Sequence, residues 1–134
     1  MKTMAAISAA LFVIACCLPA LEWKPDSGPA YVDNGLRTLA LGWSGLFGNL
    51  LTWYANPLWL WALVLALQRR PWPSTIVALV GLLLALTMFS AVGRDMPGDE
   101  GNVTKTRIIA LLPGAYVWLV GIGLPVFAVA LAGK

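Results

Sequence analysis

The sequence contains no histidine, two cysteines and few charged residues, and each shortage excludes a class of protein. Charged side chains make up 11% of the 134 residues and apolar ones 60%, whereas soluble domains carry about 25% and about 45–50%. Without histidine, this chain alone cannot form a serine–histidine catalytic pair or a histidine-ligated haem or zinc site. The nine Lys and Arg residues form no basic stripe, so a net charge of +3 gives no sign of nucleic-acid binding.

The remaining sequence consists largely of apolar runs long enough to cross a bilayer. A helix of about 20 residues spans a hydrocarbon core of about 30 Å, and the runs lack the alternation typical of membrane strands. We therefore expect an all-α fold, a four-helix transmembrane bundle that forms a single domain over residues 1–134. The crossings are expected at about residues 4–21, 49–68, 75–92 and 113–132, with short interfacial lead-in helices at Arg37–Leu46 and Ile108–Leu112.

Proline and glycine predict local features of these crossings. Pro57 falls near the middle of the second crossing, where a missing backbone donor predicts a kink or a local break. Gly81 and Ala85 give the third crossing a face of small residues for close helix packing. Gly121 and Pro125 are expected to loosen the centre of the fourth crossing. The polar stretches Glu22–Asp33 and Gly93–Arg107 are expected to be loops.

The first apolar run allows two interpretations. In the favoured one it is a retained crossing. In the other, Lys2 and the box Val13-Ile14-Ala15-Cys16 form a lipoprotein signal, which is cleaved before an acylated Cys16. The mass of the mature protein distinguishes them.

Basic residues predict the orientation of the chain. Arg69 and Arg70 lie in a connection of about six residues directly at a helix end, and such dense positive charge is typical of cytoplasmic loops. We therefore expect both termini in the cytoplasm, with all six carboxylates on the outer side.

Asn49 and Asn56 are the polar residues that we single out inside the crossings. They are seven residues apart and share one helical face. A buried amide without a partner costs about 2–7 kcal/mol, so both are expected to face protein or water. One interpretation is interhelical hydrogen bonding, in which Asn56 bonds a neighbouring helix and the carbonyl that Pro57 frees near Trp53. The other is a polar pathway for a small solute.

Aromatic and thiol side chains add two further hypotheses. Trp53, Trp59, Trp61 and Trp118 lie deep in the crossings, where they either pack in helix seams or line an aromatic cleft for a lipid or a quinone-like ring. Trp23, Trp43 and Trp72 fit the aromatic belts at the membrane surfaces. The pair Cys16-Cys17 lacks a second pair or a histidine, so packing explains it better than metal transfer.

Short motifs spread over most of the chain resemble a pattern in small uncharacterised bacterial inner-membrane proteins. The motifs are Leu18-Pro19-Ala20-Leu21, Gly42-Trp43, Trp53-Tyr54-Ala55-Asn56-Pro57-Leu58 and Gly114-Ala115-Tyr116-Val117-Trp118-Leu119. The resemblance implies a multi-pass protein of the bacterial inner membrane. It implies no activity or substrate.

Together these features predict a non-catalytic membrane protein that acts through helix–helix or protein contacts, as an accessory or assembly subunit or an immunity-type factor. Its expected partners are the lipid bilayer and another membrane protein or a second copy of the chain. We expect no catalytic, cofactor or metal site. The alternative is an uncoupled small-solute channel or carrier. The candidate contact site comprises Asn49, Trp53, Asn56, Pro57, Tyr116 and Trp118.

Overall fold

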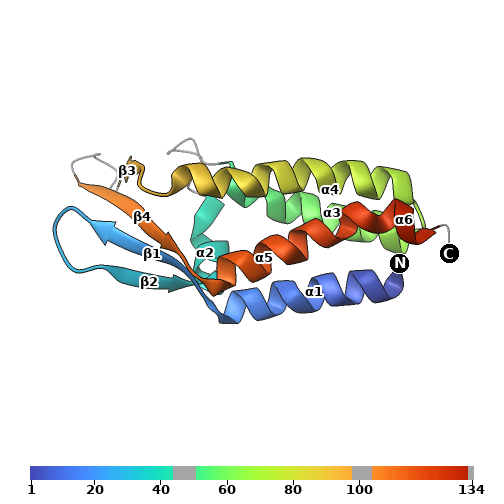
Figure 1. Cartoon of the computed structure of the whole chain (residues 1–134), viewed down its shortest axis with the longest axis horizontal. Coiled ribbons are helices and arrows are strands. Elements are labelled where there is room, and N and C mark those ends of the chain that lie inside the picture. Colours follow the sequence, from blue (N-terminus) through green and yellow to red (C-terminus); the bar gives the residue numbers. More distant parts are fainter. Residues whose placement is uncertain (44–50, 98–103, 133–134) are drawn as a thin grey trace.

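The computed structural model describes residues 1–43, 51–97 and 104–132, and it shows a mixed α/β fold that is 69% helical. Helices form one end of an elongated molecule and a four-stranded antiparallel sheet forms the other (Figure 1). The N-terminus lies at the helical end, far from the sheet.

The helical end is built from long helices that run roughly side by side (Figure 1). Helix α1 packs against α5, α3 packs against α4, and α4 also contacts α5. The short helix α2 lies near the sheet and contacts α1 and β1. Their bounds are α1 Lys2–Cys17, α2 Gly35–Leu41, the 3-10 turn η2 Thr52–Tyr54, α3 Ala55–Leu67, α4 Pro71–Leu86 with its 3-10 extension η3 Thr87–Ala91, α5 Pro113–Gly123, the 3-10 turn η4 Leu124–Phe127, and α6 Ala128–Ala132.

The sheet has the strand order β2-β1-β4-β3, with β1 Pro19–Pro25, β2 Tyr31–Asn34, β3 Asp95–Pro97 and β4 Lys105–Leu111. Strands β1 and β2 form a hairpin, and Gly28 in its turn has a φ of 127°, which favours glycine. Strand β4 then pairs with the other edge of β1. Arg107 on β4 forms ion pairs with Asp95 at 3.4 Å and Asp26 at 3.7 Å, so its charge ties neighbouring parts of the sheet together.

The expected all-α bundle of four crossings is wrong. The structure contains a four-stranded sheet, and within residues 1–43, 51–97 and 104–132 only two helices are long and apolar enough to cross a membrane. Strand β1 takes the end of the first expected crossing, residues 4–21, and β4 replaces the lead-in helix expected at Ile108–Leu112. The second expected crossing, residues 49–68, contains α3, which begins only at Ala55.

A physical reason explains each difference. A short apolar run such as Ile108-Ile109-Ala110-Leu111 does not by itself distinguish a strand from a helix. Pairing with the hairpin β1–β2 decides for the strand, because it satisfies the backbone groups on both edges of β1. The polar stretches Glu22–Asp33 and Gly93–Arg107, which were expected to be loops, supply parts of all four strands.

The two helices that meet the length and hydropathy criteria are Pro71–Ala91 and Pro113–Ala132, with 21 and 20 residues. They cover residues 75–91 of the predicted range 75–92 and all of the predicted range 113–132. Helices α1 and α3 have 16 and 13 residues, and at 1.5 Å per residue they are about 24 Å and about 20 Å long. Each is shorter than a hydrocarbon core of about 30 Å.

Three local predictions have clear outcomes. Gly81 and Ala85 are buried on α4, and a Cβ on Gly81 would lie 3.3 Å from the Leu58 Cβ, so this face does pack closely against α3. Pro125 lies in η4, where α5 gives way to a 3-10 turn, as expected. Of the kink or local break expected at Pro57, the structure shows a break, because the 3-10 turn η2 ends at Tyr54 and Pro57 lies in the first turn of α3. A helix needs no backbone donor there.

A buried polar network that the sequence did not indicate joins α1, α3 and α5. The Ser8 hydroxyl donates to the Gly121 carbonyl at 2.7 Å, and the Trp59 Nε1 donates to the Ser8 Oγ at 2.8 Å. The Trp59 ring stacks on Phe12 with centroids 4.2 Å apart. Ser8 is fully buried. Its hydroxyl both donates and accepts a hydrogen bond, as buried polar groups usually do.

Candidate functional site

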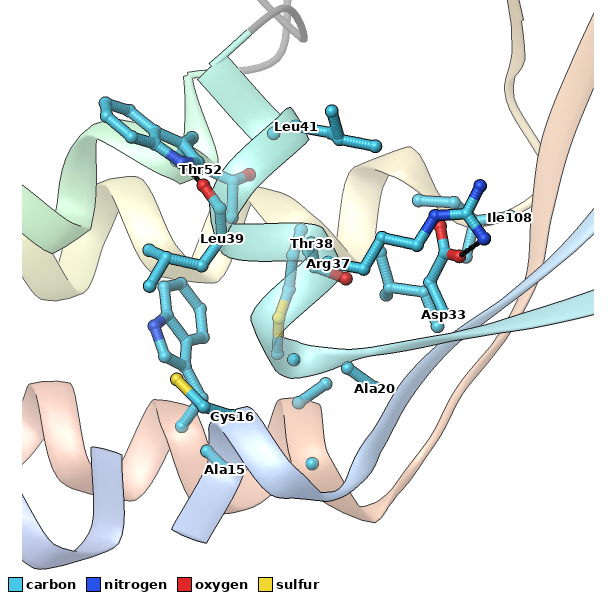
Figure 2. Close-up of a pocket in the computed structure, with 18 of the residues that line it drawn as sticks. Ala15, Cys16, Ala20, Asp33, Arg37, Thr38, Leu39, Leu41, Thr52 and Ile108 are labelled. Carbon is cyan, nitrogen blue, oxygen red and sulfur yellow. Dashed lines mark hydrogen bonds and ion pairs between the residues drawn. The ribbon is translucent and has the colours of Figure 1, made fainter. Parts of the chain in front are cut away.

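A cavity of about 260 Å³ lies where the helices meet the sheet. Its walls come from α1, the sheet, α2, the start of α3 and the start of α5. Figure 2 shows α2 crossing this region, with its residues Leu39 and Leu41 extending in different directions and with Ala15 and Cys16 at the neighbouring end of α1. The cavity is therefore formed jointly by the helical end and the sheet end of the molecule.

Asn56 lies on the wall of this cavity and joins two helices. Its Nδ2 donates to the Trp53 carbonyl at 2.9 Å, and its Oδ1 accepts from the Trp118 Nε1 at 2.8 Å. The Trp53 carbonyl is the group that the missing N–H of Pro57 leaves without its usual helical donor. The prediction that Asn56 bonds this freed carbonyl and a neighbouring helix is confirmed.

Trp53 holds α2 over the cavity. Its Nε1 donates to the Leu39 carbonyl at 2.7 Å. The Trp53 ring also lies so close to Gly42 that a Cβ there would be 2.7 Å from the ring Cδ1. Only glycine permits this approach without a shift of the ring, which gives the Gly42-Trp43 motif a packing role.

A short polar segment fixes the other end of α2. The Asn34 side chain accepts a hydrogen bond from the Arg37 backbone N–H at 2.9 Å, a typical helix N-cap. The Arg37 guanidinium lies 3.0 Å from the Asp33 carboxylate, and Figure 2 shows these two side chains extending toward each other. Asp33 and Arg37 both line the cavity, so their charges offset each other at its wall.

The six candidate residues do not form one cluster. Trp53, Asn56 and Trp118 come together on the cavity wall. Pro57 is exposed on the first turn of α3, and Tyr116 is 49% exposed on α5, with its ring 6.4 Å from that of Phe89. Asn49 lies outside the described residues.

The remaining tryptophans and cysteines are divided between the core, the cavity and the surface. Trp59 is in the core and Trp61 is exposed, so they form no common cleft with Trp53 and Trp118. Cys16 lines the cavity, whereas Cys17 is exposed, and both thiols are free.

Trp23 is a cavity residue that the sequence did not indicate, because we assigned it to a membrane-surface belt. It lies on β1 and lines the cavity beside Ile108 and Met96. Its Nε1 is buried and has no hydrogen-bond acceptor among the residues that the structure describes. Buried donors are nearly always paired, so this N–H is an exception among the described residues.

No protein-family model, curated protein or solved structure matches this chain. The resemblance to small bacterial inner-membrane proteins therefore stays a prediction.

Proposed function

We propose that this protein is an integral protein of the bacterial inner membrane that acts through binding and contacts, without catalysis. In this arrangement α4–η3 and α5–η4–α6 cross the bilayer, and α1 and α3 pack against them. The sheet lies on the outer side. Both termini lie on the cytoplasmic side.

The exposure of apolar side chains on the two long helices carries this proposal. Each helix has a mean hydropathy of 2.1, yet only 33% and 28% of their most apolar stretches are buried. The core helix of a soluble protein would bury most of such a stretch. Ile76, Leu83, Val120 and Phe127 are instead 56–65% exposed. Soluble proteins rarely expose apolar surface on this scale, whereas lipid solvates it without cost.

The density of basic residues at helix ends supports the orientation, although their number does not. Five of them lie at or near the sheet: Lys24, Arg37, Arg94, Lys105 and Arg107. The end of the molecule that carries the N-terminus and the α3–α4 connection (Figure 1) contains Lys2, Arg69 and Arg70. The carboxylates of the described segments, Glu22, Asp26, Asp33 and Asp95, all lie on the sheet strands or their connections. Basic residues directly at helix ends favour the cytoplasmic side.

Binding has more support than conduction of a solute. The Asn56 amide is engaged in hydrogen bonds within the chain, and the cavity beside it has mainly apolar walls. The small-residue face at Gly81 is occupied by α3, so a partner protein would instead contact the exposed Leu and Val side chains. These faces suit a second membrane protein, consistent with an accessory or assembly subunit.

Labelling of single cysteines tests the placement. In a background with Cys16→Ala and Cys17→Ala, one cysteine replaces Ser27 in the β1–β2 turn and another replaces Gln68 at the end of α3; both positions are exposed. An impermeant thiol reagent added to intact spheroplasts should modify Ser27→Cys and reach Gln68→Cys only after the membrane is disrupted.

The cysteine-free background is the control for non-specific labelling. The opposite pattern would show that the orientation is wrong. Equal labelling of both positions in intact spheroplasts, or recovery of the protein in the soluble fraction without detergent, would refute the membrane placement.

A further inference from the structure

The cavity between the helices and the sheet has the character of a ligand site. We propose that it binds a neutral, planar, carbonyl-bearing ring carried on an apolar chain, the chemistry of a membrane quinone. This inference rests on the proposed function, because such a ligand reaches the cavity from the bilayer.

The size and walls of the cavity favour a ring. Its volume is about 260 Å³, and an engineered apolar cavity of about 150 Å³ already holds benzene. Phe12, Trp23, Trp53 and Trp118 all line it. Aromatic side chains prefer offset-stacked or edge-to-face contacts with another ring, whereas a simple acyl chain gains nothing from that geometry.

The electrostatics favour a ligand without charge. Of the described residues that line the cavity, only Asp33 and Arg37 carry a full charge, and they pair with each other at 3.0 Å. Burial of a charged ligand would need a free counter-ion to offset its desolvation. A neutral ligand needs none.

The unpaired N–H of Trp23 favours a hydrogen-bond acceptor. Trp23 is a cavity-lining residue whose buried Nε1 has no acceptor in the described part of the chain. The indole of Trp53 donates to Leu39 and that of Trp118 to Asn56, so among these three indoles Trp23 is the one that lacks a partner. Neighbouring side chains cover the Nε1 in the unliganded structure, so they must shift before a ligand carbonyl reaches it. A carbonyl would then supply the partner, because its oxygen accepts and an indole N–H can only donate.

The position of the cavity fits a ligand that dissolves in lipid. It is bounded by the sheet ends of α1 and α5 and by the start of α3. In the proposed orientation these ends lie near the outer surface of the bilayer. A polar ring headgroup on an apolar chain concentrates near that surface.

The test uses the purified full chain in mild detergent, with decyl-1,4-benzoquinone as the probe and decylbenzene as the same apolar body without carbonyls. The unfolding temperature is followed against probe concentration, since a ligand that binds the native state raises it. We expect the quinone to bind more tightly than decylbenzene. Trp23→Phe should raise the apparent Kd for the quinone about three- to tenfold, the effect of one hydrogen bond, and leave decylbenzene unchanged.

Two controls and a filling variant complete the experiment. Trp61→Phe removes an exposed indole and should change nothing, whereas Ala20→Leu fills space at a buried lining position and should weaken both probes more than tenfold. Ala10→Leu, on the exposed face of α1, controls for added bulk. Because Trp23→Phe removes a donor that has no partner, it should fold normally even if Ala20→Leu does not.

Equal binding of the two probes would overturn the proposal, as would an unchanged quinone affinity in Trp23→Phe. Equally tight binding of monodecanoylglycerol, a carbonyl without a ring, would instead assign the cavity to lipid esters and refute the ring. Because the measurement is made in detergent, its failure leaves the cysteine-labelling result intact. A chain that fails the labelling test loses its membrane placement whatever it binds.

Discussion

Asn56 connects the start of one helix to the side of another. Its amide supplies a donor to the carbonyl that Pro57 leaves free and an acceptor to Trp118 on α5. Leucine has the same branching pattern of heavy atoms and neither function. The side chain therefore explains both why α3 can begin just before a proline and how α3 and α5 keep their register.

Replacement of Asn56 by leucine should lower the free energy of unfolding by about 0.6–2 kcal/mol, the range for interhelical hydrogen bonds in membranes. The physical reason is that the Trp118 N–H loses its acceptor and the Trp53 carbonyl loses the Asn56 donor. Thermal unfolding in detergent measures the loss. Tyr116→Phe, a change on the exposed face of α5, is the matched control and should leave the unfolding temperature within error. If Asn56→Leu unfolds at the wild-type temperature, the two hydrogen bonds do not stabilise the fold.

At the scale of single elements, the contact between α3 and α4 depends on the absence of a side chain. A Cβ at Gly81 would lie 3.3 Å from the Leu58 Cβ and 3.7 Å from the Ala55 carbonyl. A larger residue must push the two helices apart.

Gly81→Val should therefore destabilise the chain by about 1–3 kcal/mol, the usual cost of overpacking. The same measurement on Val80→Leu, which adds a carbon at an exposed position of α4, should show no loss. Gly81→Ala should fall between them, because its neighbour need shift by only a few tenths of an ångström. An ordering in which Gly81→Val is as stable as Val80→Leu would contradict close α3–α4 packing.

The elements differ in how far the sequence predicts them. The ranges of α4 and the α5–α6 column follow from local signals, a long uncharged run that begins at a proline. The strands do not, because β1 pairs with β4 through residues far apart in the chain, such as Glu22 with Ala110. Pairing between distant residues decides between strand and helix there, and local hydropathy does not predict that pairing.

The candidate site shows the same division. The bonds of Asn56 follow from the position of Pro57 one residue later, so they could be predicted. The cavity could not, because its walls include α2, which is held by Trp53, and Trp23, whose place depends on the sheet. Tyr116 was selected from a motif alone, and it lies on the outer face.

At the scale of the whole molecule, the solvent around the helices decides what a charge would do. Leu83 lies on α4 between the two ends and is 65% exposed. In water, Leu83→Lys would be harmless and would raise solubility. In a bilayer, a lysine near the helix centre costs about 2.5–3.5 kcal/mol for insertion.

We therefore expect Leu83→Lys to reduce the amount of protein inserted in membranes, measured by carbonate extraction of membrane fractions. Leu36→Lys, at a position of α2 that is 60% exposed near the sheet, is the control and should insert normally. Normal insertion of Leu83→Lys would indicate that this face of α4 meets water or another polar surface.

The pairing of β1 with β4 also has a consequence for biosynthesis. The hairpin partner of β1 follows within a few residues, but β4 emerges from the ribosome only after α3 and α4 have been made. The backbone groups on one edge of β1 therefore stay unpaired while most of the chain is synthesised. Such an edge can pair with a strand of another chain. Closure of that edge by β4 also completes one wall of the cavity, so the ligand site can exist only in the finished chain.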